Sequence, residues 1–178
     1  LAHDSRALGV IDAAARAAGW GDPLPAGRAR GMAYVESYGS LCAEVAEVSI
    51  RDGRPFVHRV VCALDCGSVV LPDGVRSQVE GGVIQGLSAA LGEQVRIANG
   101  GAADTNFDTY PLLRMMDAPE RIETLIIESG EAMGGVGEPP LPPIAPAVAN
   151  ALFALTDGVD HGVEAGGEAR ELHGQVVT

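Results

Sequence analysis

The stretch GGVGEPPLPPIAPAVAN, residues 134–150, joins a glycine run, one carboxylate and a proline run. Its glycines allow backbone angles closed to other residues, so the chain can turn tightly or approach a ligand closely. Pro139 and Pro140 fix their own φ and push the residue before each of them toward extended geometry. Glu138, which precedes both prolines, is therefore expected to be non-helical and held in one orientation.

The second half of this stretch predicts a helix over residues 143–156. Pro143 and Pro146 suit its first turn, where no amide donor is needed. Its apolar side chains recur at helical spacing and predict one buried stripe. These side chains are Ile144, Val148, Leu152 and Leu155. A single carboxylate on a fixed loop before a buried helix, such as Glu138, is arranged like a general base. A solvated loop glutamate is the alternative, and these residues alone favour it.

Upstream of this stretch, β-branched and aromatic residues predict strands. The predicted strands are residues 32–50, 56–65, 93–98 and 121–129. The pair Asp52-Gly53 is typical of a two-residue hairpin turn. At the start of the chain, a helix capped by Asp4 or Ser5 is expected to end at Gly19. Its expected apolar positions include Leu8, Ile11 and Ala15.

Residues 73–92 predict a long helix with two distinct faces. Its apolar residues recur every fourth position and predict a core stripe. These residues are Val75, Val79, Val83, Leu87 and Leu91. A second face carries Gln78, Gly82 and Gln85, although a glycine inside a helix costs about 1 kcal/mol relative to alanine. Close packing against another helix would explain the glycines, and so would close approach of a large planar ligand that bonds Gln78 or Gln85.

These elements predict an α+β fold, in which a mixed, mainly antiparallel sheet is packed by the two long helices. The 178 residues suffice for one domain with a real core. A formal net charge of -12 argues against a nucleic-acid partner, because phosphate contacts need a basic patch. No apolar run is long enough to span a membrane.

The three cysteines, Cys42, Cys62 and Cys66, do not form the regular framework of a secreted disulfide scaffold. On an extended strand, Cys62 and Cys66 would lie roughly 13 Å apart, too far to share one ion. All three are expected to be buried, small hydrophobic residues. No residue is assigned as a metal ligand.

Three segments, in this order, resemble the molybdenum hydroxylases, the family of xanthine dehydrogenase and aldehyde oxidase. They are DCGSVVLPDGVRSQVEGGVIQGLSAALGE at residues 65–93, TNFDTYPLLRM at 105–115, and GVGEPPLPPIAPAVANALFA at 135–154. The resemblance runs from about Gly31 to Thr156. It implies that the fold is part of a molybdopterin-binding domain.

The resemblance also implies roles for three residues. Glu138 matches the family's general base, and Gln78, directly before Val-Glu-Gly, matches a glutamine that contacts the cofactor. Gly137 is likewise assigned to cofactor binding. The implied cofactor is molybdopterin with molybdenum, in the cytosine dinucleotide form. The implied reaction oxidises an N-heterocycle or an aldehyde with oxygen from water, and the cofactor carries the redox chemistry.

In this family the corresponding region is the C-terminal part of a larger subunit. Residues 1–156 are therefore expected to be such a portion, and residues 157–178 a divergent, mobile tail. The implied partners are the upstream part of the same subunit, a small iron–sulfur subunit, and a small aromatic or aldehyde substrate. Surfaces left exposed would also allow a homo-oligomer. The isolated fragment is expected to be inactive, and its compartment to be the cytoplasm, or the periplasm if a twin-arginine signal precedes it.

Two other hypotheses stay open. One is a non-catalytic binding or assembly module that keeps the fold without the cofactor. The other is an unrelated hydrolase that uses Glu138 with a water molecule. The hydrolase would require a second catalytic group near Glu138, and the sequence offers no obvious candidate.

Overall fold

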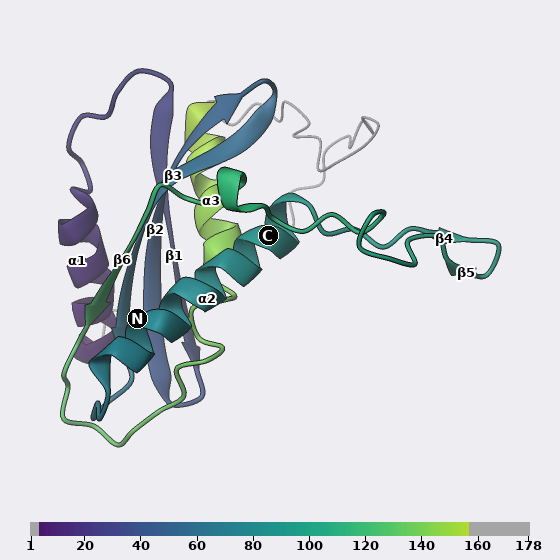
Figure 1. The fold of residues 1–178 in the computed structure, drawn as a ribbon. Coiled ribbons are helices and arrows are strands. Elements are labelled where there is room, and N and C mark those ends of the chain that lie inside the picture. Colours follow the sequence, from purple (N-terminus) through teal and green to yellow (C-terminus); the bar gives the residue numbers. More distant parts are fainter. Residues whose placement is uncertain (1–3, 157–178) are drawn as a thin grey trace.

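The computed structural model describes residues 4–156, which form a four-stranded sheet covered by helices on both faces (Figure 1). The predicted tail, 157–178, lies outside the described residues. Three α-helices are present in the described part, α1 (Ser5–Ala18), α2 (Pro72–Leu91) and α3 (Ile144–Leu155), besides one short 3-10 helix, η1 (Met115–Asp117). The sheet contains β1 (Arg28–Ser37), β2 (Ser40–Arg51), β3 (Arg54–Asp65) and β6 (Arg121–Ile126). None of the described helices is both long enough and apolar enough to cross a membrane.

The sheet has the strand order β1-β2-β3-β6. The pairs β1–β2 and β2–β3 are antiparallel hairpins, and β6 pairs with β3 in parallel. The turn at Asp52-Gly53 has positive φ at both residues, as the predicted two-residue turn requires. Tyr38-Gly39 makes a second turn of the same kind between β1 and β2. The predicted α+β class with a mixed, mainly antiparallel sheet is thus confirmed.

One predicted strand was wrongly placed. Within residues 93–98 only β4 (Ile97–Ala98) is a strand, and it pairs with β5 (Gly101–Ala102) in a separate hairpin. Asn99 and Gly100 both have positive φ and fold the segment back on itself, so its nearest partner is its own neighbour rather than the sheet. The hairpin lies at the end of a long arm between α2 and β6 that extends away from the sheet (Figure 1).

The two faces of the sheet are covered by different helices (Figure 1). Side chains alternate between faces along a strand, so Leu41, Ala43 and Val45 of β2 pack against α1, while Cys42 and Ala46 pack beneath α2 and α3. The buried stripes predicted for α2 and α3 are confirmed in their first members, whereas Leu91 of α2 and both Leu152 and Leu155 of α3 are only half-buried.

The buried face of α1 differs from the predicted one. Asp4 caps the helix and Gly19 ends it in the left-handed conformation, both as expected. Leu8 is nevertheless 39% exposed, and the fully buried positions are mostly alanines. They are Ala7, Val10, Ala14 and Ala18. Ile11 packs at the edge of this face, but Leu8 lies off it, because the helix lies close to the sheet, where small side chains fit.

The glycines of α2 serve close packing within the chain. A Cβ on Gly82 would lie 3.1 Å from Pro140 Cβ, and one on Gly86 would overlap Leu141 O and Ile144. Gly31 of β1 likewise allows the backbone of α3 to approach, because a Cβ there would overlap Ala147 O. Of the two explanations for the glycines of α2, packing accounts for Gly82 and Gly86.

Candidate functional site

The loop from residue 127 to 143 leads from β6 to α3 and carries Glu138. Its glycines lie directly on the β1–β2 hairpin. Gly135 N donates to Tyr38 O at 2.9 Å, and Ser40 Oγ donates to Gly135 O at 2.6 Å. A Cβ on Gly134 would overlap Ser40 Oγ, and one on Gly135 would lie 2.9 Å from Tyr38 Cβ. The close approach predicted for these glycines therefore occurs, with this chain's own hairpin as the partner.

Glu138 is non-helical and exposed, at the first position of a turn closed by Leu141 N donating to Glu138 O at 2.9 Å. Pro139 and Pro140 are buried, so the turn is anchored while the carboxylate reaches solvent. Tyr38 lies beside it. The hydrogen bond to the Glu138 carboxylate, and then its negative charge, raise the pKa of the Tyr38 hydroxyl. Glu138 thus has an aromatic hydroxyl as a neighbour and remains exposed.

Gln78 and Gly137 come together at the same place. Gln78 is exposed on α2, and a Cβ built on Gly137 would lie 3.5 Å from Gln78 Oε1. The glutamine amide therefore faces a backbone position without a side chain, one residue before Glu138. Gln85 is not part of this group. It lines a separate open groove with Glu80 and Leu113, where the arm leaves α2.

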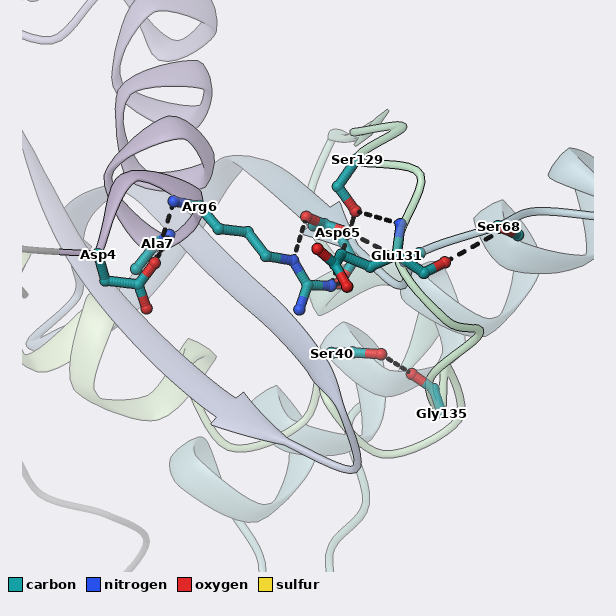
Figure 2. Close-up of polar contacts among 10 residues, drawn as sticks. Asp4, Arg6, Ala7, Ser40, Asp65, Ser68, Ser129, Glu131 and Gly135 are labelled. Carbon is teal, nitrogen blue, oxygen red and sulfur yellow. Dashed lines mark hydrogen bonds and ion pairs between the residues drawn. The ribbon is translucent and has the colours of Figure 1, made fainter.

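A buried carboxylate that sequence reasoning did not single out holds the start of this loop. Asp65, at the end of β3, is fully buried and receives two hydrogen bonds from Arg6, Nε to Oδ2 at 2.6 Å and Nη2 to Oδ1 at 2.9 Å. Gly67 N and Ser129 Oγ also donate to Oδ1, at 2.9 and 2.8 Å. Figure 2 shows Arg6, from α1, and Ser129, from the loop after β6, beside the Asp65 carboxylate. We call these four residues the Asp65 junction.

The environment of the Asp65 junction favours a charged carboxylate. Burial alone would raise the pKa of Asp65, but the hydrogen bonds from Arg6, Gly67 and Ser129, with the charge of Arg6, outweigh burial and lower it. An Asp two residues before a Gly at a strand end is a known turn signal, so the sequence contained half of this feature. Its pairing with Arg6, 59 residues away, has no local signal.

A second buried carboxylate, Glu44, lies in the sheet beside two thiols. Cys42 Sγ and Cys62 Sγ are 3.4 Å apart, and the potential ligand atoms of Cys42, Glu44 and Cys62 lie within 4.8 Å of one another. Within residues 4–156, neither Glu44 oxygen has a hydrogen-bond partner. The cysteines are free and buried, as predicted.

Burial and close contact raise the pKa values of Glu44 and Cys62. Burial raises the pKa of Glu44 well above its ordinary value, and the nearby Cys62 thiol offsets only part of this. The contact with Cys42, followed by burial, raises the pKa of Cys62. All three side chains are fully buried and belong to the core on the α2 and α3 face of the sheet.

The fold and the sequence together define the class of protein. The structure aligns with quinoline 2-oxidoreductase from Pseudomonas putida 86 at a TM-score of 0.60 and 23% identity, over 66% of this chain and 16% of that chain. This likeness concerns the fold alone. Residues 12–119 match the molybdopterin cofactor-binding domain, and the chain belongs to that family. The predicted relation to the molybdenum hydroxylases, which are oxidoreductases, is thereby confirmed.

Two curated relatives are similar to this chain in sequence. The beta subunit of isoquinoline 1-oxidoreductase from Brevundimonas diminuta is 43% identical over 132 residues, which cover 73% of this chain and 17% of the relative. A nicotinate dehydrogenase subunit from Pseudomonas putida is 34% identical over 175 residues, which cover 86% of this chain and 14% of the relative. The chain therefore spans less than a fifth of either relative.

Proposed function

We propose that this chain forms one wall of the cofactor site in a molybdenum-dependent hydroxylase that oxidises an N-heterocycle or an aldehyde. The supporting observation is that Gln78 lies beside Gly137 and Glu138 at one exposed place. Gln78 is on α2, far in sequence from the other two residues. The relatives whose names include isoquinoline and nicotinate support the N-heterocycle as the first substrate class to test.

The residues at this place fit a bound molybdopterin. The Gln78 amide offers both a donor and an acceptor, and Gly137 leaves room for a ligand to approach the backbone. Gln78, Gly137 and Glu138 are exposed, so none of them is used up by the core of this chain. We propose the cytosine dinucleotide form of the cofactor, whose nucleotide would be held by the upstream part of the same subunit.

In this proposal the cofactor supplies the two-electron oxidation, and the chain supplies orientation and proton transfer. The Glu138 carboxylate accepts the proton of the water-derived oxygen nucleophile that attacks the electron-poor carbon. The buried Pro139 and Pro140 hold the Glu138 backbone, and the Tyr38 hydroxyl, whose pKa the Glu138 carboxylate raises, lies beside it. Gln78 holds the cofactor by its amide. The base is therefore presented from a fixed turn at the edge of the cofactor site.

We further propose that the chain works only within a larger assembly. Electrons would leave through a small iron–sulfur subunit, and the upstream part of the same large subunit would complete the pocket. The three cysteines are buried in the sheet or at its end, so they are poorly placed to bind an iron–sulfur cluster at a subunit surface. Alone, the chain would not turn over substrate.

The test compares three forms of the intact enzyme: the wild type, Glu138→Gln, and the control Glu128→Gln, which changes an exposed carboxylate on the same loop. Each is assayed for molybdenum and for oxidation of isoquinoline, nicotinate and benzaldehyde, in water enriched in oxygen-18. We expect molybdenum in all three, label in the product, and loss of turnover by about 100-fold or more in Glu138→Gln only. Molybdenum absent from the folded wild type would instead support a non-catalytic assembly module.

A further inference from the structure

The segment that carries the proposed base contains no helix or strand from residue 127 to 143. Such a segment holds a side chain in place only if its backbone is bound elsewhere. The turn after β3 provides these bonds. Ser68 N and Oγ donate to Glu131 O at 3.1 and 3.2 Å, and Gly134 N donates to Cys66 O at 2.9 Å. The 65–68 turn is therefore the template on which the first part of the loop lies (Figure 2).

The shape of this template depends on Asp65. Its Oδ1 accepts Gly67 N, which fixes the turn, and also accepts Ser129 Oγ, which fixes the loop. Gly67 has a φ of 70° and lies so close to Ala132 O that a Cβ would overlap it. Asp65 Oδ1 thus binds both the turn, through Gly67, and the loop, through Ser129. Ser129 lies three residues before Ala132.

Arg6 fixes the Asp65 carboxylate in turn. Its guanidinium binds both oxygens, which is the bidentate geometry that defines a carboxylate's orientation as well as its place. Arg6 comes from the first turn of α1, on the opposite face of the sheet from α2 and α3. No neutral side chain of the same size could accept all four hydrogen bonds, because an amide replaces one acceptor oxygen with a donor.

We propose that Asp65 is a positioning residue for the Gly137–Glu138 turn, held by Arg6 and acting through Ser129 and the loop backbone. This rests on the proposed role of Glu138. The charged Asp65 junction keeps residues 127–137 on the 65–68 turn and the β1–β2 hairpin, so that the Glu138 carboxylate stays directed toward the cofactor. Asp65 does not touch the substrate or the cofactor.

The test uses the intact, molybdenum-loaded enzyme with Asp65→Asn and Ser129→Ala. The matched control is Asp73→Asn, which breaks the exposed Arg76–Asp73 pair on α2. We expect kcat to fall about 100-fold in Asp65→Asn and about 10-fold in Ser129→Ala, since small misplacements of a reacting group have effects of this size. Molybdenum content should stay unchanged, and the amides of residues 129–135 should exchange faster with solvent in both variants but not in the control.

Several outcomes would overturn the proposal. Wild-type kcat in a folded Asp65→Asn enzyme would do so, and so would a fall in kcat without faster exchange in the loop. If Asp65→Asn does not fold, Ser129→Ala decides alone, because it keeps the Arg6–Asp65 pair. The exchange measurement also separates this proposal from the previous one. Suppose that the loop exchanges faster in Asp65→Asn and Ser129→Ala but that Glu138→Gln is active. The Asp65 junction would then hold the loop in place, but it would have no role in positioning a catalytic base.

Discussion

Asp65 and Glu44 are two buried carboxylates on adjacent strands of one sheet, and their environments are opposite. Asp65 receives four hydrogen bonds, two of them from a guanidinium, and its pKa is lowered. Glu44 has no hydrogen-bond partner among the described residues, and burial raises its pKa. Burial alone therefore does not determine the charge of a carboxylate in this fold; the available donors do.

The position along the strand explains this difference. Asp65 is the last residue of β3, where the following turn presents a free amide and where Arg6 and Ser129 can reach. Glu44 lies in the middle of β2, between β1 and β3, where the backbone amides are already engaged in the ladder. The strand end thus surrounds Asp65 with donors, whereas at the middle of β2 no described residue donates to Glu44.

The largest expected effect is that of Asp65→Ala on stability. It removes four hydrogen bonds and leaves Arg6 partly buried without its partner, so we expect a loss of about 3 kcal/mol at pH 7. Because folding lowers the pKa of Asp65, its contribution is present above its ordinary value of 3.8 and is lost as the pH falls through the folded value. Urea unfolding at pH 7 and pH 3 measures this.

The difference between wild type and Asp65→Ala should therefore shrink at pH 3. Ser129→Ala is the matched comparison, because it removes one hydrogen bond and keeps the ion pair. We expect it to cost about 1 kcal/mol at pH 7. An equal difference between wild type and Asp65→Ala at both pH values would mean that the charge of Asp65 contributes nothing to stability.

Much of this architecture could be predicted from the sequence. The Asp52-Gly53 turn, the cap at Asp4 and the stripe along α2 are local signals, and each predicted its element correctly. Residues 93–98 were wrongly assigned to the main sheet. Their side chains favour a strand, but they do not indicate which strand would pair with it. Pairing partners are not encoded in a short segment, so β4 was placed in the wrong sheet.

Residues of the candidate site could be proposed from the sequence only where a motif contained them. Gln78 and Glu138 came from the resemblance to a family, and their meeting through Gly137 came from the structure. Asp65 was seen only as the end of a strand, because Arg6 and Ser129 lie 59 and 64 residues away. Contacts between distant residues depend on tertiary packing, for which a single sequence has no direct signal.

An intermediate effect is expected from Gly31→Ala, which acts on the environment of Glu44. The added Cβ would overlap the α3 backbone at Ala147, and helix α3 must move away from the sheet. Overpacking of this kind costs about 1–3 kcal/mol. The displaced helix would admit water to the face of β2 that carries Glu44.

Urea unfolding gives the cost of Gly31→Ala, and a carbon-13-labelled glutamate spectrum gives the protonation of Glu44. We expect the pKa of Glu44 to fall toward its ordinary value of 4.5 in this variant. Gly9→Ala is the control, because that glycine has helical backbone angles and open space around its Cβ position, and lies in α1 on the other face of the sheet. A destabilised Gly31→Ala protein with an unchanged Glu44 would show that α3 does not keep this carboxylate dry.

The smallest effect is expected at Glu44 itself, and its sign is opposite to that of Asp65. Folding raises the pKa of Glu44. Its contribution to the stability of the folded protein is therefore fully present below pH 4.5, and it is lost as the pH rises toward and through the pKa of the folded state. Glu44→Gln cannot ionise, so this loss should disappear. Glu44→Leu should also remove the unpaired polar atoms and stabilise the protein by about 1 kcal/mol at pH 8.

Thermal or urea unfolding of the wild type and these two variants between pH 5 and pH 8 separates the two effects. If the free energy of unfolding of the wild type instead rises over this range while that of neither variant does, Glu44 is charged and paired in solution. The contrast with Asp65 would then be lost.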